Sequence, residues 1–499
     1  MRRALFLTAL SAAMLGTPAL GQDASGETVS RASGRNAALP QATKGAVPQD
    51  VLATAEALMA RALGSDIGYE IVRDLTTEVG ARLAGSEAEA RARDWSVTRL
   101  EALGFEDVRV EPFEIPFWAR TFEAASIVSP FPQELMITAL GNSVGTPEGG
   151  VTGEVVRFET LDDLIDAPLT DGNGDASLEG KIVFVDEGMT RTQDGSGYGQ
   201  AVRKRSGAAQ AAGARGAVAA LIRSVGTDRH RFPHTGNMRY GDVQTRVPTA
   251  ALSFPDAEQL QRAMERGPVT VNLDIGVRTE DSAPSGNVIA EIPGTGDEIV
   301  VIGAHLDSWD LGTGAVDDGA GVGIVAGAAK LILDHVEETG ERPLRTIRVV
   351  LFGAEEVGLY GAYAYAEAHA DELDRHAVGA ESDFGAGRVW QLQTRFGEGA
   401  QAAGDQMARV MAPMGVARGG NDASGGPDMT PLRAAGVPVV TLKQDGWDYF
   451  DLHHTHDDTL DKIDPDDIAQ NVAAYAAFAW MAANAPDGFR GDGAEDAGR

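Results

Sequence analysis

The C-terminal half of this sequence alternates short apolar strands with helices, and this pattern limits the possible folds more than any other feature. The predicted strands are at residues 299–304, 346–352, 377–381 and 437–442. The predicted helices are at residues 321–336, 358–373, 400–412 and 466–485. Nearly continuous apolar strands that alternate with helices are typical of a parallel sheet covered on both faces. We therefore predict an α/β fold with a doubly wound, mostly parallel sheet.

The rest of the sequence divides into segments that differ in composition. Residues 117–280 contain β-rich stretches and one helical pattern at 206–222, with no cluster of metal ligands, which indicates an inserted domain. The predicted segments are a signal peptide at 1–21, a flexible leader at 22–48, the N-terminal part of the main domain at 49–116, the inserted domain at 117–280, the main domain at 281–485 and a disordered tail at 486–499.

The first residues and the overall charge bear on location and partners. A basic start, a short apolar run and the small residues Ala19 and Gly21 form the pattern of a signal peptide, so we expect a secreted or periplasmic protein. The net charge of −32 argues against nucleic acid or an anionic membrane as a partner. No apolar run is long enough for a membrane span, and the absence of cysteine excludes a disulfide, a cysteine nucleophile and a lipid-anchored form.

Imidazoles and carboxylates follow the ends of the predicted strands. In strand order they are His305 and Asp307, then Glu355 and Glu356, then Asp383, then His453 and His454. Ligands of open α/β sheets bind beyond the carboxyl ends of the strands, so we expect these groups to meet at one edge. Each motif alone has a simpler interpretation: Asp317 and Asp318, for example, could cap the following helix.

Taken together, these groups predict a metal site. Several carboxylates cannot stay ionised in a cleft without a cation, because burying unpaired charge costs several kcal/mol per ion. Mixed imidazole and carboxylate ligands suit Zn²⁺, with Mn²⁺ or Co²⁺ as alternatives. Two metals bridged by one Asp would use the whole set and would form a hydrolytic site.

The motifs that carry these groups also resemble a known family. They are "GAHLDSWDLGTGAVDDGAG" from Gly303, "LFGAEEVGLYGA" from Leu351, "ESD" from Glu381 and "HHTHDDTL" from His453. The chain is similar in these motifs to the co-catalytic dizinc exopeptidases of the aminopeptidase and glutamate carboxypeptidase type. The resemblance covers about residues 50–484. It implies the zinc exopeptidase fold, with a protease-associated-like inserted domain.

The resemblance assigns a role to each site residue. It implies two Zn²⁺ per chain. The first would be bound by His305 and Asp383, the second by Glu356 and His454, and Asp317 would bridge both. Glu355 would be the general base, and Asp307 would hold the second ring nitrogen of His305. The role of His453 stays open, and the resemblance suggests an oxyanion-stabilising Tyr at this position in related enzymes. The resemblance also implies a cis peptide bond after Asp317.

The resulting interpretation is a secreted zinc-dependent exopeptidase that hydrolyses short peptides or dipeptides through a metal-activated water. The expected partner is the peptide substrate, and a homodimer is a possible assembly. One alternative is a single-zinc acyl transferase such as a glutaminyl cyclase. The other is a non-catalytic binding module on the same fold. The complete ligand set argues against the first alternative, and the presence of the base argues against the second.

Two questions about the substrate stay open in the sequence. Acidic residues in the motif loops favour a free α-amine: Asp310, Asp318, Asp451 and Asp457. The basic candidates for a substrate carboxylate are Arg388, Arg395 and Lys443. The inserted domain also has a polar loop at 227–242, which includes His234. This loop is either solvent-exposed or closes over the metal edge, and in the second case His234 would contact the substrate.

Overall fold

A computed structural model describes residues 45–169 and 178–490 of the chain, and its centre is one continuous 14-stranded sheet. The main domain contains the strands in the order β13-β12-β14-β11-β9-β10-β8. Their bounds are Ala417–Arg418, Val389–Arg395, Val439–Gln444, His376–Glu381, Ile299–His305, Thr346–Phe352 and Thr270–Ile292. β10, β9, β11 and β14 are parallel. β8 runs antiparallel to β10, and β12 runs antiparallel to β14 but parallel to β13. The predicted mostly parallel α/β sheet is therefore confirmed.

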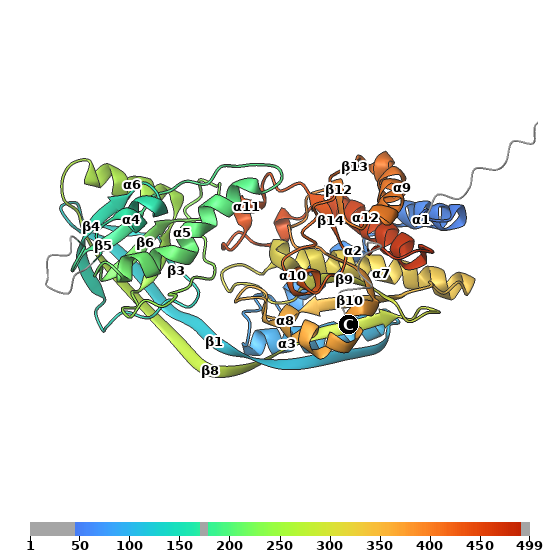
Figure 1. Ribbon diagram of the computed structural model, residues 1–499. Helices are drawn as coiled ribbons and strands as arrows, with labels where there is room; N and C mark the ends of the chain where they lie inside the picture. The colour runs from blue at the N-terminus through green and yellow to red at the C-terminus, as the bar shows by residue number, and fades with distance from the viewer. Residues whose placement is uncertain (1–44, 170–177, 491–499) are drawn as a thin grey trace, which may run out of the picture. The chain divides into compact units, whose positions relative to one another are not determined.

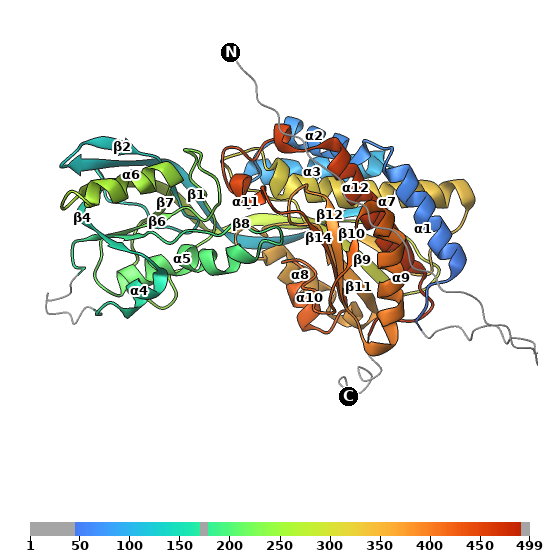
Figure 2. The ribbon, with the colours of Figure 1, turned by 90° about the horizontal axis from the view of Figure 1, so that it is seen from above.

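Helices cover both faces of this sheet because its central strands have no polar face. In β9, Val300 and Ile302 pack on one helix layer, whereas Ile299 and Val301 pack on the other. The first layer consists of α1 (Gln49–Ala62), α2 (Ile67–Glu78), α7 (Ala320–Thr339) and α12 (Pro465–Asn484), with α9 (Gln401–Met411) beside them (Figure 1, Figure 2). The second consists of α8 (Tyr360–Ala368) and α10 (Thr430–Ala434). The helix α3 (Glu87–Ala102) packs against β8 and β1.

The inserted domain continues the same sheet in the order β8-β4-β5-β6-β7-β3. The added strands are β4 (Val151–Phe158), β5 (Ile182–Val185), β6 (Ala219–Arg223), β7 (Thr249–Leu252) and β3 (Ile137–Ala139). β4 to β7 are parallel, and three helices connect or flank them: α4 (Leu161–Asp166), α5 (Ser196–Gly213) and α6 (Phe254–Met264). This domain is thus mixed α/β, with more helix than its β-rich sequence suggests.

Two long strands connect the inserted domain to the main domain. β1 (Glu106–Ser129) and β8 pair antiparallel from Glu106–Glu291 to Ser129–Thr270, and β2 (Gln133–Leu135) pairs with the end of β1 (Figure 1). The sequence placed a domain limit near residue 280, but β8 runs through this position without interruption. The predicted signal peptide and most of the predicted leader and tail lie outside the described residues.

The helix predicted at 206–222 is correct only in its first part. α5 ends at Gly213, and residues from Ala219 form β6, the strand between β5 and β7. Gly216 adopts φ +79°, a left-handed conformation that ends the helical path. The alanine-rich sequence favours a helix, but full burial between two strands decides the outcome for Ala219–Arg223.

Within the described ranges, one helix is long and apolar enough to cross a membrane. It extends over Ala315–Thr339, and 72% of its apolar window is buried in the protein. It includes α7, the central helix of the first layer, so its apolar composition is accounted for by packing in the core.

The close approach of α7 and α2 leads to a prediction for Gly323. A Cβ atom at this position would lie 2.5 Å from the carbonyl oxygen of Gly68 and 2.6 Å from Val72 Cγ2. We expect Gly323→Ala to destabilise the fold by about 1–3 kcal/mol, because the two helices must separate. Thermal unfolding measures this loss. Gly199→Ala in α5 is the control, since a Cβ there meets nothing within 4 Å and should not lower the melting temperature.

Candidate metal centre

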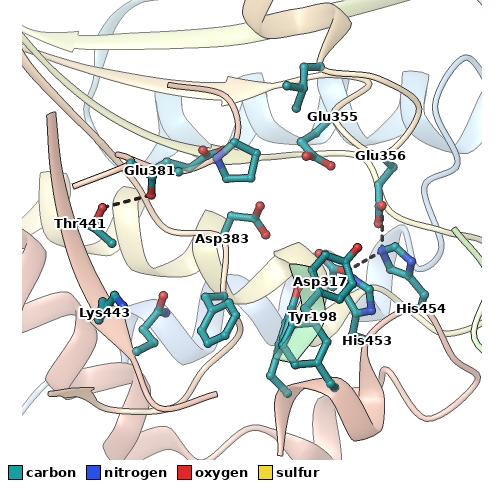
Figure 3. A pocket seen from close by; sticks show the side chains of 18 of the residues that line it. Tyr198, Asp317, Glu355, Glu356, Glu381, Asp383, Thr441, Lys443, His453 and His454 are labelled. Carbon is teal, nitrogen blue, oxygen red and sulfur yellow. Dashed lines mark hydrogen bonds and ion pairs between the residues drawn. The ribbon is translucent and has the colours of Figure 1, made fainter. Parts of the chain in front are cut away.

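The C-terminal ends of four parallel strands bring the predicted site residues together. His305 ends β9, Glu355 and Glu356 follow β10, and Asp383 follows β11. Asp317 lies in the irregular turn Ala315–Gly319 before α7. His453 and His454 follow the short helix α11 (Tyr449–Leu452), which comes after β14. Figure 3 shows Asp317, Asp383, Glu355 and Glu356 around one open space.

The first group of ligand atoms consists of His305, Asp317 and Asp383. His305 Nε2 lies 3.1 Å from Asp317 Oδ1 and 3.5 Å from Asp383 Oδ1. His305 is fully buried, and Asp317 is 3% exposed. The three ligand atoms lie within 4.8 Å of one another, a spacing at which one ion can contact all of them.

The second group uses the other oxygen of Asp317. His454 Nε2 lies 3.1 Å from Asp317 Oδ2 and 2.9 Å from Glu356 Oε2. His453 also faces this group, with its Nε2 3.8 Å from Asp317 Oδ2. The Asp317 carboxylate therefore has one oxygen toward each group. The peptide bond that follows Asp317 is cis, as the family resemblance implies.

The donor set fits divalent cations. Asp317 Oδ2 and Glu356 Oε1 are buried and have no hydrogen-bond donor among the described residues. Burial lowers the pKa of His454, but the carboxylates of Glu356 and Asp317 outweigh burial and raise this pKa to about 9. A site that concentrates unpaired carboxylate oxygens around imidazoles is suited to ions that replace the protons on its ligands. Two ions with Asp317 between them would use both groups.

Backbone carbonyls fix the orientation of both ligand imidazoles. His305 Nδ1 donates a hydrogen bond to the Asp307 carbonyl oxygen at 2.9 Å, and His454 Nδ1 lies 3.2 Å from the Thr235 carbonyl oxygen. A proton on Nδ1 leaves Nε2 free for a metal. Asp307 thus holds His305 mainly through its backbone, because its carboxylate Oδ1 is 3.7 Å from the ring nitrogen.

The Asp307 carboxylate has a different contact from the one that the sequence predicts. It accepts hydrogen bonds from the backbone N–H groups of Glu355, at 2.9 Å, and Glu356, at 3.3 Å. Asp307 therefore positions the segment that carries both glutamates. Burial raises the pKa of the Glu355 carboxyl well above its usual range, and the carboxylates of Asp383 and Glu356 raise it further.

Two residues that the sequence analysis did not select hold the loop that carries Asp317. Asp458 accepts the backbone N–H groups of Val316, at 2.6 Å, and Asp317, at 3.3 Å. Arg82 is fully buried, and its guanidinium donates to three carbonyl oxygens of the loop, which belong to Leu306, Thr313 and Gly314. Asp458 lies in the "HHTHDDTL" motif and could have been found there. Arg82 stands in no recognisable motif.

The metal groups open into a cavity of about 540 Å³. Its wall includes Glu355, Glu381, Phe384, Ser424, Thr441, Lys443 and Tyr449 from the main domain (Figure 3). Asp194, Tyr198, Arg205 and Asn237 come from the inserted domain. Tyr198 stacks on Phe450, and its hydroxyl accepts a hydrogen bond from Arg205. Lys443 was expected from the sequence, whereas these four residues of the inserted domain were not.

His234 does not line this cavity. Its side chain is buried, with Nδ1 2.7 Å from the His453 carbonyl oxygen and Nε2 2.8 Å from Asp228 Oδ1. Both ring nitrogens are thus engaged by the protein, so the side chain is not placed for the expected substrate contact. His230 faces Asp457 and is more than half exposed, whereas Tyr240 is buried and donates to the Val247 carbonyl oxygen.

The acidic loop residues that favoured a free α-amine also have other contacts. Asp310 pairs with Arg120, and Asp451 pairs with Arg191. Asp318 accepts the backbone N–H groups of His305 and Gly321. None of these three residues lies on the described cavity wall, so they do not support recognition of an amine. Arg388 pairs with Asp467 and also lies away from this wall.

Known protein families and curated relatives match most of the chain. The model of peptidase family M28 matches residues 287–479, and the PA domain model matches residues 151–260. Carboxypeptidase Q from mouse and from human are each 34% identical over 419 residues, which cover 83% of this chain and 85% of the relative. The probable lipoprotein aminopeptidase LpqL of Mycobacterium tuberculosis is 30% identical over 58% of this chain and 51% of its own.

Solved structures are similar over most of the chain. A peptidase M28 precursor from Shewanella amazonensis SB2B has a TM-score of 0.85 at 50% identity, over 88% of this chain and 98% of that chain. An aminopeptidase from Aneurinibacillus sp. strain AM-1 has a TM-score of 0.59 at 21% identity, over 87% of this chain and 99% of that chain, and thus shares the fold. The predicted fold class, with its inserted domain, is confirmed.

The contacts of Asp458 predict that it supports the metal groups. In Asp458→Asn an amide NH₂ replaces one oxygen that accepts a backbone N–H group, so the turn at Asp317 should loosen. Loss of such a supporting contact typically costs about 10- to 100-fold in metal affinity. Competition with a chromophoric chelator measures this affinity. Asp457→Asn is the matched control, because Asp457 is partly exposed and its ion pairs among the described residues are with His230 and Lys462. Equal affinities for the two variants would exclude the role of Asp458.

Proposed function

The chain belongs to peptidase family M28 and is a zinc-dependent exopeptidase, and from this premise we propose that it cleaves dipeptides and other short peptides at a centre of two zinc ions. His305 and Asp383 would bind one ion, and Glu356 and His454 the other. Asp317 would bind both. The observation that carries the proposal is the Asp317 carboxylate, which directs one oxygen toward each group.

The side chains around the two ions suggest how the reaction proceeds. Zinc supplies a Lewis acid that makes water more acidic and polarises the scissile carbonyl. Glu355 faces the cavity but belongs to neither ligand group, so its carboxylate is free to accept a proton. It would act as the general base that takes the proton from the attacking water and would later deliver it to the leaving amine. The hydrogen bond that the Glu355 backbone N–H donates to the Asp307 carboxylate keeps Glu355 in place for this transfer.

The cavity favours a small substrate with a free carboxylate. Its volume of about 540 Å³ lies within the range of small-molecule sites, about 300–1,000 Å³. Apart from the histidines, the cationic side chains of its wall are Arg205 and Lys443. Arg205 already donates to Tyr198. Lys443 is therefore the cation that a substrate carboxylate would contact, on the opposite side of the cavity from His454 in the view of Figure 3.

The other two functions considered from the sequence have less support. A single-zinc acyl transferase would need only one of the two ligand groups, whereas this chain has the side chains for both. A binding module would not need a half-buried glutamate at position 355, on the cavity wall and held beside the ligands by its backbone N–H. Secretion is part of the proposal and depends on residues 1–21, which lie outside the described residues. A homodimer stays a prediction.

The two adjacent glutamates should differ in their effects. We expect Glu355→Gln to retain two zinc ions per chain and to lose about 10²- to 10⁴-fold in kcat, the usual range for a lost general base. Glu356→Gln should lose one zinc ion, because Glu356 is a ligand. Elemental analysis of the purified proteins, together with hydrolysis rates, separates the two cases. One zinc ion in the wild-type protein would instead support the single-zinc alternative.

Lys443 provides a test of which end of the substrate is recognised. Lys443→Met should raise KM for dipeptides by about 10- to 100-fold, because a hydrogen bond to a charged group contributes about 1.5–3 kcal/mol. KM for the C-terminally amidated dipeptides should be high in the wild type and should change little in the variant. Lys462→Met is the matched control, since Lys462 pairs with Asp461 outside this cavity. An unchanged KM for free dipeptides would refute carboxylate recognition by Lys443.

A further inference from the structure

The segment that carries His454 is held by the inserted domain as well as by its own domain. His454 adopts φ +63°, in the left-handed region that residues other than glycine rarely occupy. Such a conformation persists only where the surrounding structure enforces it. The contacts that enforce it therefore decide where the His454 imidazole points.

Two consecutive residues of the inserted domain bind the backbone on both sides of this position. The Thr235 N–H group donates to the His454 carbonyl oxygen at 3.1 Å, and the Thr235 carbonyl oxygen faces His454 Nδ1 at 3.2 Å. His234 Nδ1 donates to the His453 carbonyl oxygen at 2.7 Å. We call residues 234 and 235 the strap. It fixes the backbone and the ring orientation of His454 together.

The strap is itself supported within the inserted domain. Asp228 Oδ1 lies 2.8 Å from His234 Nε2, and the backbone N–H of His234 donates to Ser224 Oγ at 2.9 Å. Asp228 and His234 are both buried. Nearby, Arg191 and Thr227 of the inserted domain bind the carboxylate of Asp451 in α11. The inserted domain thus holds the segment that leads to His454 at two places, the Asp451 carboxylate and the His453 carbonyl oxygen.

The first group of ligands has a different support. His305 Nδ1 donates to the Asp307 carbonyl oxygen, and the His305 N–H group donates to Asp318, both within the main domain. The two metal groups share Asp317 but differ in what holds their histidines. A change in the strap should therefore affect one group much more than the other.

We infer that the inserted domain is part of the metal centre, and that His234 is a positioning residue that sets the affinity of the His454 group for its ion. The inference rests on the proposed two-zinc centre. It assigns to His234 a role through His453 and His454, with no direct contact to the substrate. The domain that bounds the cavity would thereby also set the metal occupancy of the enzyme.

Two isosteric variants separate the two contacts of His234. The amide nitrogen of Asn can replace Nδ1, so His234→Asn should keep the bond to the His453 carbonyl oxygen. The amide nitrogen of Gln can replace Nε2, so His234→Gln should keep only the contact with Asp228. Zinc is titrated into each metal-free protein against a competing chelator. His234→Gln should weaken one of the two binding steps by about 10-fold or more, whereas His234→Asn should remain near the wild type.

A reference variant identifies the affected step. His454→Ala removes a ligand of the second group, and the step that it abolishes should be the one that His234→Gln weakens. The visible absorption of the Co²⁺-loaded protein gives a second readout, because only the bands that His454→Ala removes should change. Arg203→Ala is the control for the inserted domain, since Arg203 forms an exposed pair with Asp162. Thermal unfolding of the metal-free proteins shows whether the variants fold.

The outcomes discriminate between the inference and the proposed function. Equal weakening of both steps by His234→Gln, or the same effect from His234→Asn, would overturn the positioning role. An unchanged titration for both variants would overturn it as well. A wild-type protein that binds two zinc ions but does not cleave peptides would refute the proposed function and leave the role of His234 open to the same titration.

Discussion

The Asp317 carboxylate, buried between two imidazoles, is the interaction on which the rest of this structure depends. Each of its oxygens faces a different histidine at 3.1 Å, and further carboxylates stand beside each ring. Such a concentration of buried charge favours the binding of cations, because burying unpaired charge costs several kcal/mol per ion. The position of this one side chain therefore couples the two metal groups. The turn that carries it must be held more firmly than an ordinary loop.

The chain holds this turn with buried charges that act on backbone groups. The carboxylates of Asp318 and Asp458 accept N–H groups, and the Arg82 guanidinium donates to carbonyl oxygens of the same loop. Asp307 acts in the same way on the segment of Glu355 and Glu356. Charge-assisted hydrogen bonds are stronger than neutral ones, so they suit loops without regular secondary structure. Residues far apart in the sequence thus all hold the loops that carry the metal ligands and Glu355.

The inserted domain contributes to the centre because of how it is connected. β1 and β8 run antiparallel from the main domain into the inserted domain, so the two domains share a continuous ladder of hydrogen bonds. Contacts such as those of Arg191 with Asp451 and of Thr235 with His454 then join them near the metal groups. The wall of the cavity consequently comes from both domains, and this confines the space for a substrate.

The sequence alone determined the α/β class and the set of candidate ligands. Apolar strands have no polar face, and parallel strands end at one edge, so His305, Glu356, Asp383 and His454 had to approach one another. What the sequence could not decide depends on contacts between distant segments. It did not indicate that Arg82 would donate hydrogen bonds to the Asp317 loop, or that Asp307 would bind backbone groups. It also did not indicate that residues 219–223 would form a strand. It offered His234 as a substrate contact, whereas the fold buries it against His453. Local patterns specify residue types and periodicity, but only tertiary packing determines which buried groups become partners.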